Sequence, residues 1–332
     1  MKKRASKVLI FVCIISILAA ALFIVNKDGA AGSSNSVTLT KAEREWLNAN
    51  PKLVYAADKN APPLRFLDKS DNQYKGVVVD YVNLLSVEIG FTVELHPLLW
   101  EDALASLAEG KSDMCDMFPS EERGKYYLFT KPFYNLRAVM AVRTNDNITT
   151  KSLRDKNFKI AVQKGDYTNE FLNKNYPELK LVYVPDVYEA LMLLDKGEVD
   201  AIVGDEPVVL YQLNENNLKD RIKIGGEPLY ESGCVIAVPR SKPQLISILN
   251  KGIDALTRKE QVEKIQQKWF GISAPIAKQY DIGKLKSYLA LLLAAALFIF
   301  LIMFILAKSL KNQVRLRTRE LEDSRNNLQI VF

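Results

Sequence analysis

Histidine is almost absent from this sequence, because His96 is the only one among 332 residues. It lies in a segment, 91–98, whose pattern is typical of a β-strand. A single imidazole leaves no multi-histidine metal site, and no catalysis based on histidine is available. The sequence therefore predicts neither a bound metal nor a cofactor.

Charge is absent from two long segments, 8–25 and 288–307, of 18 and 20 residues. A helix rises about 1.5 Å per residue, so the second segment spans about 30 Å, the thickness of the hydrocarbon core of a bilayer. Core helices rarely run this long without a polar face, so we predict a transmembrane helix here. The first segment exceeds the apolar run of about 7–15 residues in a signal peptide, which favours an uncleaved anchor over a cleaved signal.

A basic excess is absent from the region between these segments. The formal net charge of +6 arises from residues 1–7 and 308–332, which carry +4 and +3, while the other 35 basic and 36 acidic side chains almost balance. Basic residues beside apolar spans mark cytoplasmic ends. We therefore predict a two-pass protein of the plasma membrane whose middle region lies outside the cell membrane, and we expect no nucleic-acid partner.

Cysteine is also scarce, with three residues in the whole chain. Cys13 lies in the first apolar segment. Cys115 and Cys234 lie in the exported region, where a disulfide could persist, but sequence spacing does not show whether they are within bonding distance. Two small buried thiols are the simpler expectation.

Strand-like and helix-like segments alternate through the exported region. The expected strands are 52–58, 91–98, 113–118, 158–165, 179–185 and 199–205, and the expected helices are 77–90, 100–110, 166–176 and 186–197. Such alternation predicts α/β layers with mainly parallel sheets. Two series of this size predict two lobes rather than one continuous sheet, with the extended stretches 136–144 and 234–240 as candidate crossings between them.

The two ends of this region are expected to be helical. Thr40 and Glu43 have the spacing of a capping box, and Pro51 closes the helix that they begin. The stretch 243–271 carries apolar residues at helical spacing, so we expect it to pack back on the first lobe.

Several short motifs of the exported region occur in the order typical of one family. They are "APPLRF", "GVVVDYVNLLS", "WEDALASLAEGKSD", "SEER" with "FTKPFY", "IAVQKG", "VDAIVGDEPV", "CVIAVP" and "KWFG". In this order they resemble the bacterial extracellular solute-binding proteins of family 3, which take polar amino acids. The opening "LTKAEREWLNANPKL" is more similar to the membrane-anchored sensors of that family than to its free transport proteins.

The resemblance implies a Venus flytrap fold over residues 40–272, in which two α/β lobes close on a ligand. Lobe 1 is expected to comprise about 40–138 and 234–272, and lobe 2 about 139–233. Linkers at 26–39 and 273–287 would join these lobes to the predicted membrane segments.

The same resemblance implies a role for Arg123. In the family, the arginine of a Thr/Ser-x-x-Arg turn binds the α-carboxylate of the ligand, and Ser120 matches the hydroxyl residue of that turn. A guanidinium has a rigid fork of donors that matches two carboxylate oxygens. The alternative is a surface arginine paired with Glu121 or Glu122.

Asp205 is the expected partner of the ligand ammonium. It follows the strand 199–205, where the family places an aspartate, and α/β folds bind ligands at such strand ends. Because Pro207 follows it, Asp205 is also a candidate helix N-cap.

Some positions depart from the family pattern. Transport members have Gly-Thr-Thr or Gly-Thr-Ser where this chain has Gly165, Asp166 and Tyr167, and Phe118 stands where a hydroxyl is usual. Asp166 would compete with an anionic ligand group at the helix N-terminus, or would cap that helix itself.

The ligand therefore stays open at this point. A free amino acid is the leading expectation. A diamine or another small acid also fits a cleft with carboxylates at Asp116, Asp166 and Asp205 and guanidinium groups at Arg65 and Arg123. Trp100, Phe66 and Tyr134 are candidate apolar walls, although core packing explains the last two equally well.

The C-terminal segment 308–332 is charged and helical in pattern. Val314, Leu321 and Leu328 repeat at seven, a short coiled-coil signal, and a solvated helix is the alternative. The segment resembles the linker that precedes a PAS or kinase module, so we expect a longer receptor of the histidine kinase or diguanylate cyclase type, acting as a homodimer.

Three functions remain from the sequence. The first is a receptor that senses an amino-acid-like ligand outside the membrane and signals by lobe closure. The second is a membrane-tethered binding subunit for uptake. The third is a dehydratase-type enzyme on the same scaffold, for which Glu206 and Glu231 are candidate general acids, although residues 1–332 contain no catalytic motif.

Overall fold

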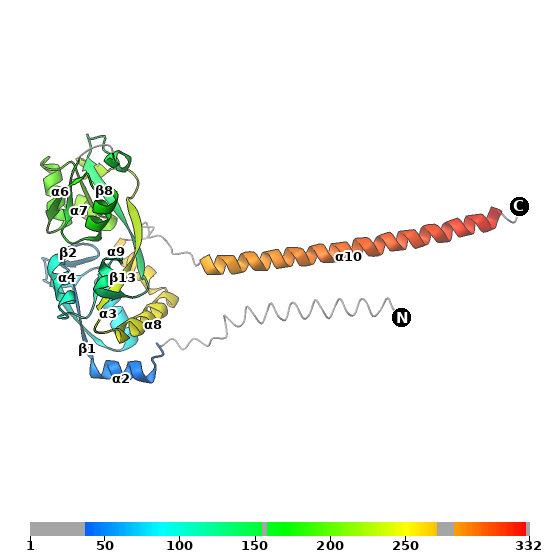
Figure 1. Ribbon diagram of the computed structural model, residues 1–332, viewed down its shortest axis with the longest axis horizontal. Helices are drawn as coiled ribbons and strands as arrows, with labels where there is room; N and C mark the ends of the chain where they lie inside the picture. The colour runs from blue at the N-terminus through cyan, green and yellow to red at the C-terminus, as the bar shows by residue number, and fades with distance from the viewer. Residues whose placement is uncertain (1–36, 155–157, 271–281, 330–332) are drawn as a thin grey trace. The chain divides into compact units, whose positions relative to one another are not determined.

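The computed structural model describes residues 37–154, 158–270 and 282–329, and the chain divides into two units, Met1–Ile276 and Ala277–Phe332. The first predicted membrane segment, 8–25, and Cys13 lie outside the described residues. The first unit contains the two lobes that the alternating strands and helices predict (Figure 1).

Lobe 1 is built on a parallel pair of strands, β1 (Lys52–Asp58) and β5 (Thr92–Leu98), joined through the helix α3 (Val77–Ile89). Apolar residues of α3 face this core, and Gly90 ends the helix in the left-handed conformation with φ +94°. Around the pair lie the small sheet β2 (Asn60–Ala61), β3 (Arg65–Leu67) and β4 (Tyr74–Lys75), the helix α4 (Trp100–Ala108), and the strands β6 (Cys115–Met117) and β7 (Tyr127–Phe129).

Two further segments belong to lobe 1. The helix α2 (Lys41–Ala49) begins with the predicted capping box, in which Thr40 and Glu43 bond each other reciprocally. Glu43 also bonds Lys251 and Ser247 of α8 (Gln244–Arg258), which fixes α2 to the lobe. The helices α8 and α9 (Gln261–Phe270) pack back on α3 as expected, and a side chain at Gly252 would lie 2.5 Å from Ile89 Cδ1.

Lobe 2 has parallel strands β9 (Lys159–Gln163), β10 (Lys180–Val184) and β11 (Ala201–Asp205). The helices α5 (Tyr167–Asn175), α6 (Val187–Asp195) and α7 (Glu206–Glu215) connect or follow them, and the short strand β12 (Ile222–Ile224) pairs with β8. Two 3₁₀ turns complete the unit, η1 (Arg123–Lys125) in lobe 1 and η2 (Thr150–Arg154) in lobe 2.

Two ten-residue strands, β8 (Tyr134–Arg143) and β13 (Tyr230–Pro239), cross between the lobes (Figure 1). The first half of β13 pairs with β8, and its second half pairs with β6 and β7 of lobe 1. The predicted crossings are therefore confirmed. The expectation of two separate, mainly parallel sheets is wrong in detail. Because β13 changes partners along its length, strands of both lobes belong to one hydrogen-bonded sheet. The pairs that β13 forms with β8, β6 and β7 are antiparallel.

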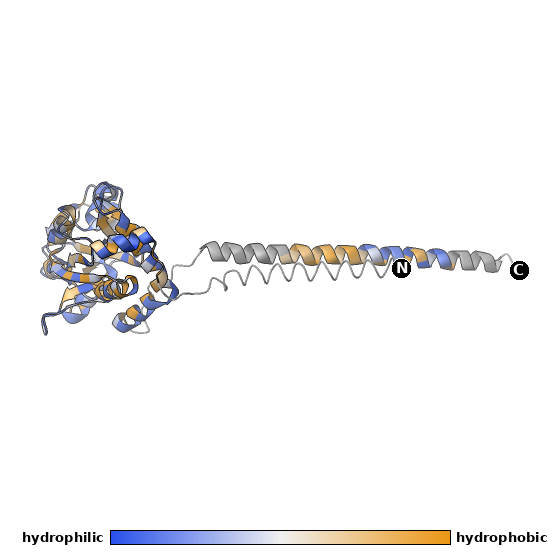
Figure 2. Cartoon of the chain, turned by 90° about the horizontal axis from the view of Figure 1, so that it is seen from below, coloured by the Kyte–Doolittle hydropathy of each residue, from blue (hydrophilic) through white to orange (hydrophobic). Residues whose placement is uncertain are grey.

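The second unit is the helix α10 (Ile282–Gln329). Within the described residues, its portion Ala295–Leu321 is long and apolar enough to cross a membrane by length and composition. Figure 2 shows an apolar section of α10 followed by a hydrophilic one. The apolar portion overlaps the membrane helix predicted for 288–307, which stays a prediction.

Candidate ligand-binding cleft

A small cavity lies where the two lobes meet. It is lined by Arg65, Trp100, Asp116, Met117, Phe118, Arg123, Tyr134, Leu136, Asp166, Asp205 and Cys234. Seven of the eleven residues predicted for the site are therefore brought together. The free space is only about 10 Å³, which is room for roughly one water molecule. The lobes are thus closed on each other in this structure, and an amino acid would require them to separate.

Arg123 forms hydrogen bonds with both lobes in this closed state. Its side chain is buried, and its Nε donates to Glu170 Oε1 of lobe 2 at 2.9 Å. Its Nη1 donates to the carbonyl of Phe118 at 3.1 Å, and its Nη2 donates to the carbonyl of Gly165 at 2.9 Å. The ring of Tyr167 lies 5.9 Å from the guanidinium carbon. Arg123 therefore connects lobe 1 to lobe 2 at the edge of the cavity that it lines.

The turn before Arg123 has the predicted form. Ser120 Oγ accepts the backbone N–H of Arg123 at 3.1 Å, so this hydroxyl shapes the turn and does not line the cavity. The alternative pairing with Glu121 or Glu122 is wrong, since the partner is Glu170. Sequence reasoning missed Glu170, although its spacing of four from Asp166 places both carboxylates on one face of α5.

Arg65 forms the other buried ion pair of the cavity. Its Nη1 lies 3.1 Å from Asp116 Oδ2, and both side chains are buried. Tyr55 and Tyr134 donate their hydroxyls to the same carboxylate, at 2.5 and 3.4 Å. Burial, followed by the Asp116 charge, raises the pKa of Tyr55 well above its ordinary value. Asp116 is therefore satisfied by this chain.

Asp205 is different, because its Oδ1 is buried and has no hydrogen-bond partner among the described residues. It stands at the N-cap position of α7, but its side chain makes no capping bond. Asp205 is therefore the N-cap residue by position, as the alternative had it, but its carboxyl group does not bond the helix amides. Burial, and then the nearby charge of Asp166, raise its pKa from 3.8 to about 8.

Asp166 caps helix α5, as one of the two expectations had it. Its Oδ1 accepts the backbone N–H of Thr168 at 2.7 Å. The preceding Gly165 has φ +77°, which an L side chain rarely adopts, and a Cβ there would lie 3.2 Å from Leu104 Cδ1. One amide of this helix end, that of Thr168, is consequently used by the side chain of Asp166.

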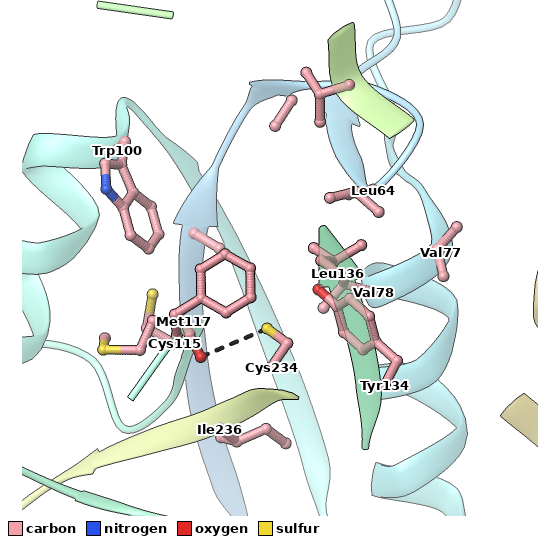
Figure 3. Close-up of a cluster of buried hydrophobic side chains, with 14 of the residues drawn as sticks. Leu64, Val77, Val78, Trp100, Cys115, Met117, Tyr134, Leu136, Cys234 and Ile236 are labelled. Carbon is pink, nitrogen blue, oxygen red and sulfur yellow. Dashed lines mark hydrogen bonds between the residues drawn. The ribbon is translucent and has the colours of Figure 1, made fainter. Parts of the chain in front are cut away.

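Aromatic residues form half of the apolar wall, together with Met117, Leu136 and Cys234. Figure 3 shows Trp100 on α4 beside the strand that carries Cys115 and Met117, with Cys234 and Tyr134 across from it. The Cys234 thiol donates to the carbonyl of Met117 at 3.6 Å (Figure 3), and both Cys115 and Cys234 are free and buried, as the simpler expectation had it.

Two of the aromatic residues predicted for the site, Tyr167 and Phe66, lie away from the closed cavity. Tyr167 does not line the cavity but packs on Phe118 and Tyr230, with ring centres 5.8 and 5.2 Å away. Phe66, a predicted cleft wall, does not line this closed cavity either. Its ring contacts Tyr211 of lobe 2 and Trp269 of α9, because the β2–β4 sheet turns it toward the lobe boundary.

Further polar contacts hold the lobes together. Gln163 Nε2 donates to Asp58 Oδ2 at 2.6 Å, and Asn60 Nδ2 donates to Asp186 Oδ2 at 2.9 Å. Sequence reasoning did not identify these residues, because each pair joins segments more than a hundred residues apart. Among the described residues there is also no cluster of histidine, cysteine, aspartate or glutamate that could hold a metal ion.

A wider groove lies on the other side of the Arg123–Glu170 pair. It has about 700 Å³ of free space and is lined by residues of the η1 turn and of α5, among them Ser120, Tyr167 and Glu170. Glu170 therefore stands between this groove and the inner cavity that Arg123 lines.

Comparison with known proteins gives a consistent result. The family model of bacterial extracellular solute-binding proteins, family 3, matches residues 53–272. The virulence sensor protein BvgS of Bordetella pertussis (strain Tohama I) is 24% identical over 283 residues, which is 83% of this chain and 22% of BvgS, so the chain spans about a fifth of that relative.

Two binding proteins are similar over the lobed unit. The L-cystine-binding protein TcyJ of Escherichia coli (strain K12) is 26% identical over 223 residues, 66% of this chain and 82% of TcyJ. The crystal structure of the substrate binding protein of an amino acid ABC transporter has a TM-score of 0.59 and 28% identity, and the match covers 66% of this chain and 99% of that one. With a matched region of this extent and two lobes around a closed cleft, the chain belongs to family 3 of the bacterial extracellular solute-binding proteins and has their Venus flytrap fold.

Proposed function

We propose that this chain is the sensing part of a membrane-anchored receptor that binds a small polar molecule between its lobes. The observation that carries the proposal is the cavity at the lobe boundary, where charged side chains of both lobes meet and Asp205 Oδ1 has no partner among the described residues. A buried carboxylate without a partner costs free energy, so a ligand that pairs with it favours the closed state.

The sensor role rests on the extent of the similarity. The match to BvgS covers 83% of this chain, whereas the match to the binding protein TcyJ stops at 66%. A ligand shifts the balance between open and closed lobes only by its difference in affinity for the two states. In our proposal this shift passes through the span 288–307 to the helix 308–332 and to an effector beyond it, in a homodimer at the plasma membrane.

The roles of the site residues are part of this proposal. Asp205 receives an ammonium group of the ligand. Arg123 would bind a ligand carboxylate only if Glu170 were displaced, since Glu170 accepts from its Nε in the closed state. The boundaries 40–272 for the binding domain, with its two lobes and linkers, are proposed as stated above.

A second candidate is the binding subunit of an uptake system, because TcyJ and the solved transport protein share the lobed fold. That function needs a single anchor, so the long apolar part of α10 favours the receptor. The two candidates differ in a simple observation: deletion of residues 288–332 abolishes signalling by a receptor but leaves the ligand uptake of a tethered subunit intact.

The proposal is tested by a thermal-shift screen of residues 38–275, a unit that corresponds to a solved relative consisting of this domain alone. Amino acids, amines, small carboxylic acids and sugars are screened. A true ligand raises the melting temperature by mass action, and Asp205→Asn abolishes the shift for ligands with an amine. If no compound of any class changes the melting temperature of the folded domain, the proposed function is wrong.

A further inference from the structure

The ligand class can be narrowed from the groups that the closed cleft has already satisfied. We infer that the cleft selects a small organic amine that carries a neutral oxygen, such as a hydroxyl or an amide, and that lacks a carboxylate. This inference rests on the proposed function, because it concerns the ligand of the same cleft.

The guanidinium of Arg123 offers little to a ligand carboxylate. Three of its five N–H groups already donate to the protein, and the one on Nε donates to the carboxylate of Glu170 from the opposite lobe. A ligand carboxylate would have to replace a partner that belongs to the chain and therefore loses little freedom on bonding.

The capping position at the start of α5 is also occupied, by a carboxylate of the chain. Asp166 caps this helix through Thr168 N, and the carbonyl of Gly165 accepts from Arg123. A helix N-terminus binds anions when its amides are free, but here a carboxylate of the chain has taken that place. Both elements of an anion site are thus occupied by acidic side chains of the protein itself.

Arg65 does not supply the missing positive charge. Asp116 neutralises it at 3.1 Å, so a carboxylate near Arg65 would also lie near the Asp116 charge. Counting Glu170, the two guanidinium groups of the cleft are outnumbered by the three carboxylates of Asp116, Asp166 and Glu170, before the carboxyl group of Asp205 is counted. An ammonium group reduces this imbalance, whereas a zwitterion leaves it unchanged.

Three buried polar atoms show where such a ligand would bond. Asp205 Oδ1 is an acceptor without a partner, and Trp100 Nε1 and Arg65 Nε are donors without a partner among the described residues. Trp100 is 3% exposed and lines the cavity. The acceptor suits an ammonium group of the ligand, and the two donors suit one neutral ligand oxygen. A neutral oxygen satisfies these donors without bringing a further negative charge into the buried site.

The test uses matched ligands that differ only at the carboxyl position. Alanine, leucine and lysine are each compared with their primary amides and with their amino alcohols, by isothermal titration of the full chain in detergent micelles. We expect the amides and alcohols to bind at least tenfold more tightly than the parent amino acids. Equal or tighter binding of the amino acids would overturn the inference.

Glu170→Gln sharpens the test. This near-isosteric change frees the charge of Arg123, so we expect it to shift the preference toward the amino acids at least tenfold. Glu206→Gln is the matched control, because Glu206 also pairs with an arginine, Arg137, but does not line the cavity. Melting of each variant without ligand verifies its fold. A preference that Glu170→Gln leaves unchanged would contradict the role given to Glu170.

The failure of this inference is distinct from the failure of the proposed function. If none of the amine series binds but another class in the screen does, the amine inference is wrong and a ligand-sensing cleft remains. If nothing in the entire screen binds, both are wrong.

Discussion

The carboxyl group of Asp205 makes the stability of the lobed domain depend on pH in an unusual direction. Its pKa is about 8 in the folded protein against 3.8 in the unfolded chain, because burial and the Asp166 charge disfavour its ionised form. Between these values the folded state holds a proton that the unfolded state has released. The free energy of unfolding therefore falls as the pH rises from about 4 to about 8.

The size of this effect follows from the shift. One pKa unit corresponds to about 1.4 kcal/mol, so the raised pKa of Asp205 accounts for at most about 5 kcal/mol between these limits. Separation of the lobes exposes Asp205 to water. The measured decrease in the free energy of unfolding is therefore smaller if the lobes separate easily in the folded state. Replacing Asp205 with Asn removes the titrating group and keeps its shape, so the variant is more stable than the wild type at high pH.

The measurement is urea unfolding of residues 38–275 at pH 5 and at pH 8.5, for the wild type and Asp205→Asn. Titrating groups that do not interact with Asp205 cancel in the difference between the two proteins. We expect this difference to move in favour of Asn by more than about 2 kcal/mol as the pH rises. A difference that is the same at both pH values would refute the claim that Asp205 is buried without a partner.

Two further predictions concern the packing of lobe 1. Gly76→Ala places a Cβ 2.3 Å from the carbonyl oxygen of Leu64 at φ +135°, so we expect it to lower the free energy of urea unfolding by more than about 3 kcal/mol. Gly90→Ala is the control, because it has a similar φ of +94° but open space around the Cβ, and it should lower that free energy by about 1 kcal/mol. Equal losses in the two variants would contradict the close approach at Gly76. Burial raises the pKa of the Cys115 and Cys234 thiols, and both thiols are free. We therefore expect iodoacetamide to modify neither thiol in the native protein and both thiols after unfolding without reductant, as measured by mass spectrometry. If Cys115 and Cys234 stay unmodified in the unfolded chain, they form a disulfide.

The strands and helices with strong periodicity could be predicted from the sequence. The helix 77–90 ends at Gly90 as its glycine indicates, and the strand 199–205 ends at Asp205. These features depend on local pattern and turn chemistry. The same local information predicted that β8 and β13 cross between the lobes.

The contacts between the lobes could not be predicted in the same way. The partner of Arg123 lies 47 residues away, and only the fold brings Glu170 to it. The direction of Phe66 depends on a three-residue strand, too short to specify which face is buried. The family resemblance placed Arg123 and Asp205 at one cleft, but it carried no information about which carboxylates of this chain already occupy it.

The anchoring of α2 on α8 has a consequence for how movement leaves the domain. The described part of the domain begins with α2 and ends with α9, and both helices pack on lobe 1. The chain passes between lobe 1 and lobe 2 only along β8 and β13. A swing of lobe 2 by itself therefore leaves entry and exit at a constant separation. In the receptor that we propose, a signal to the membrane would therefore be a tilt or strain of lobe 1 as a whole, produced by the movement of lobe 2.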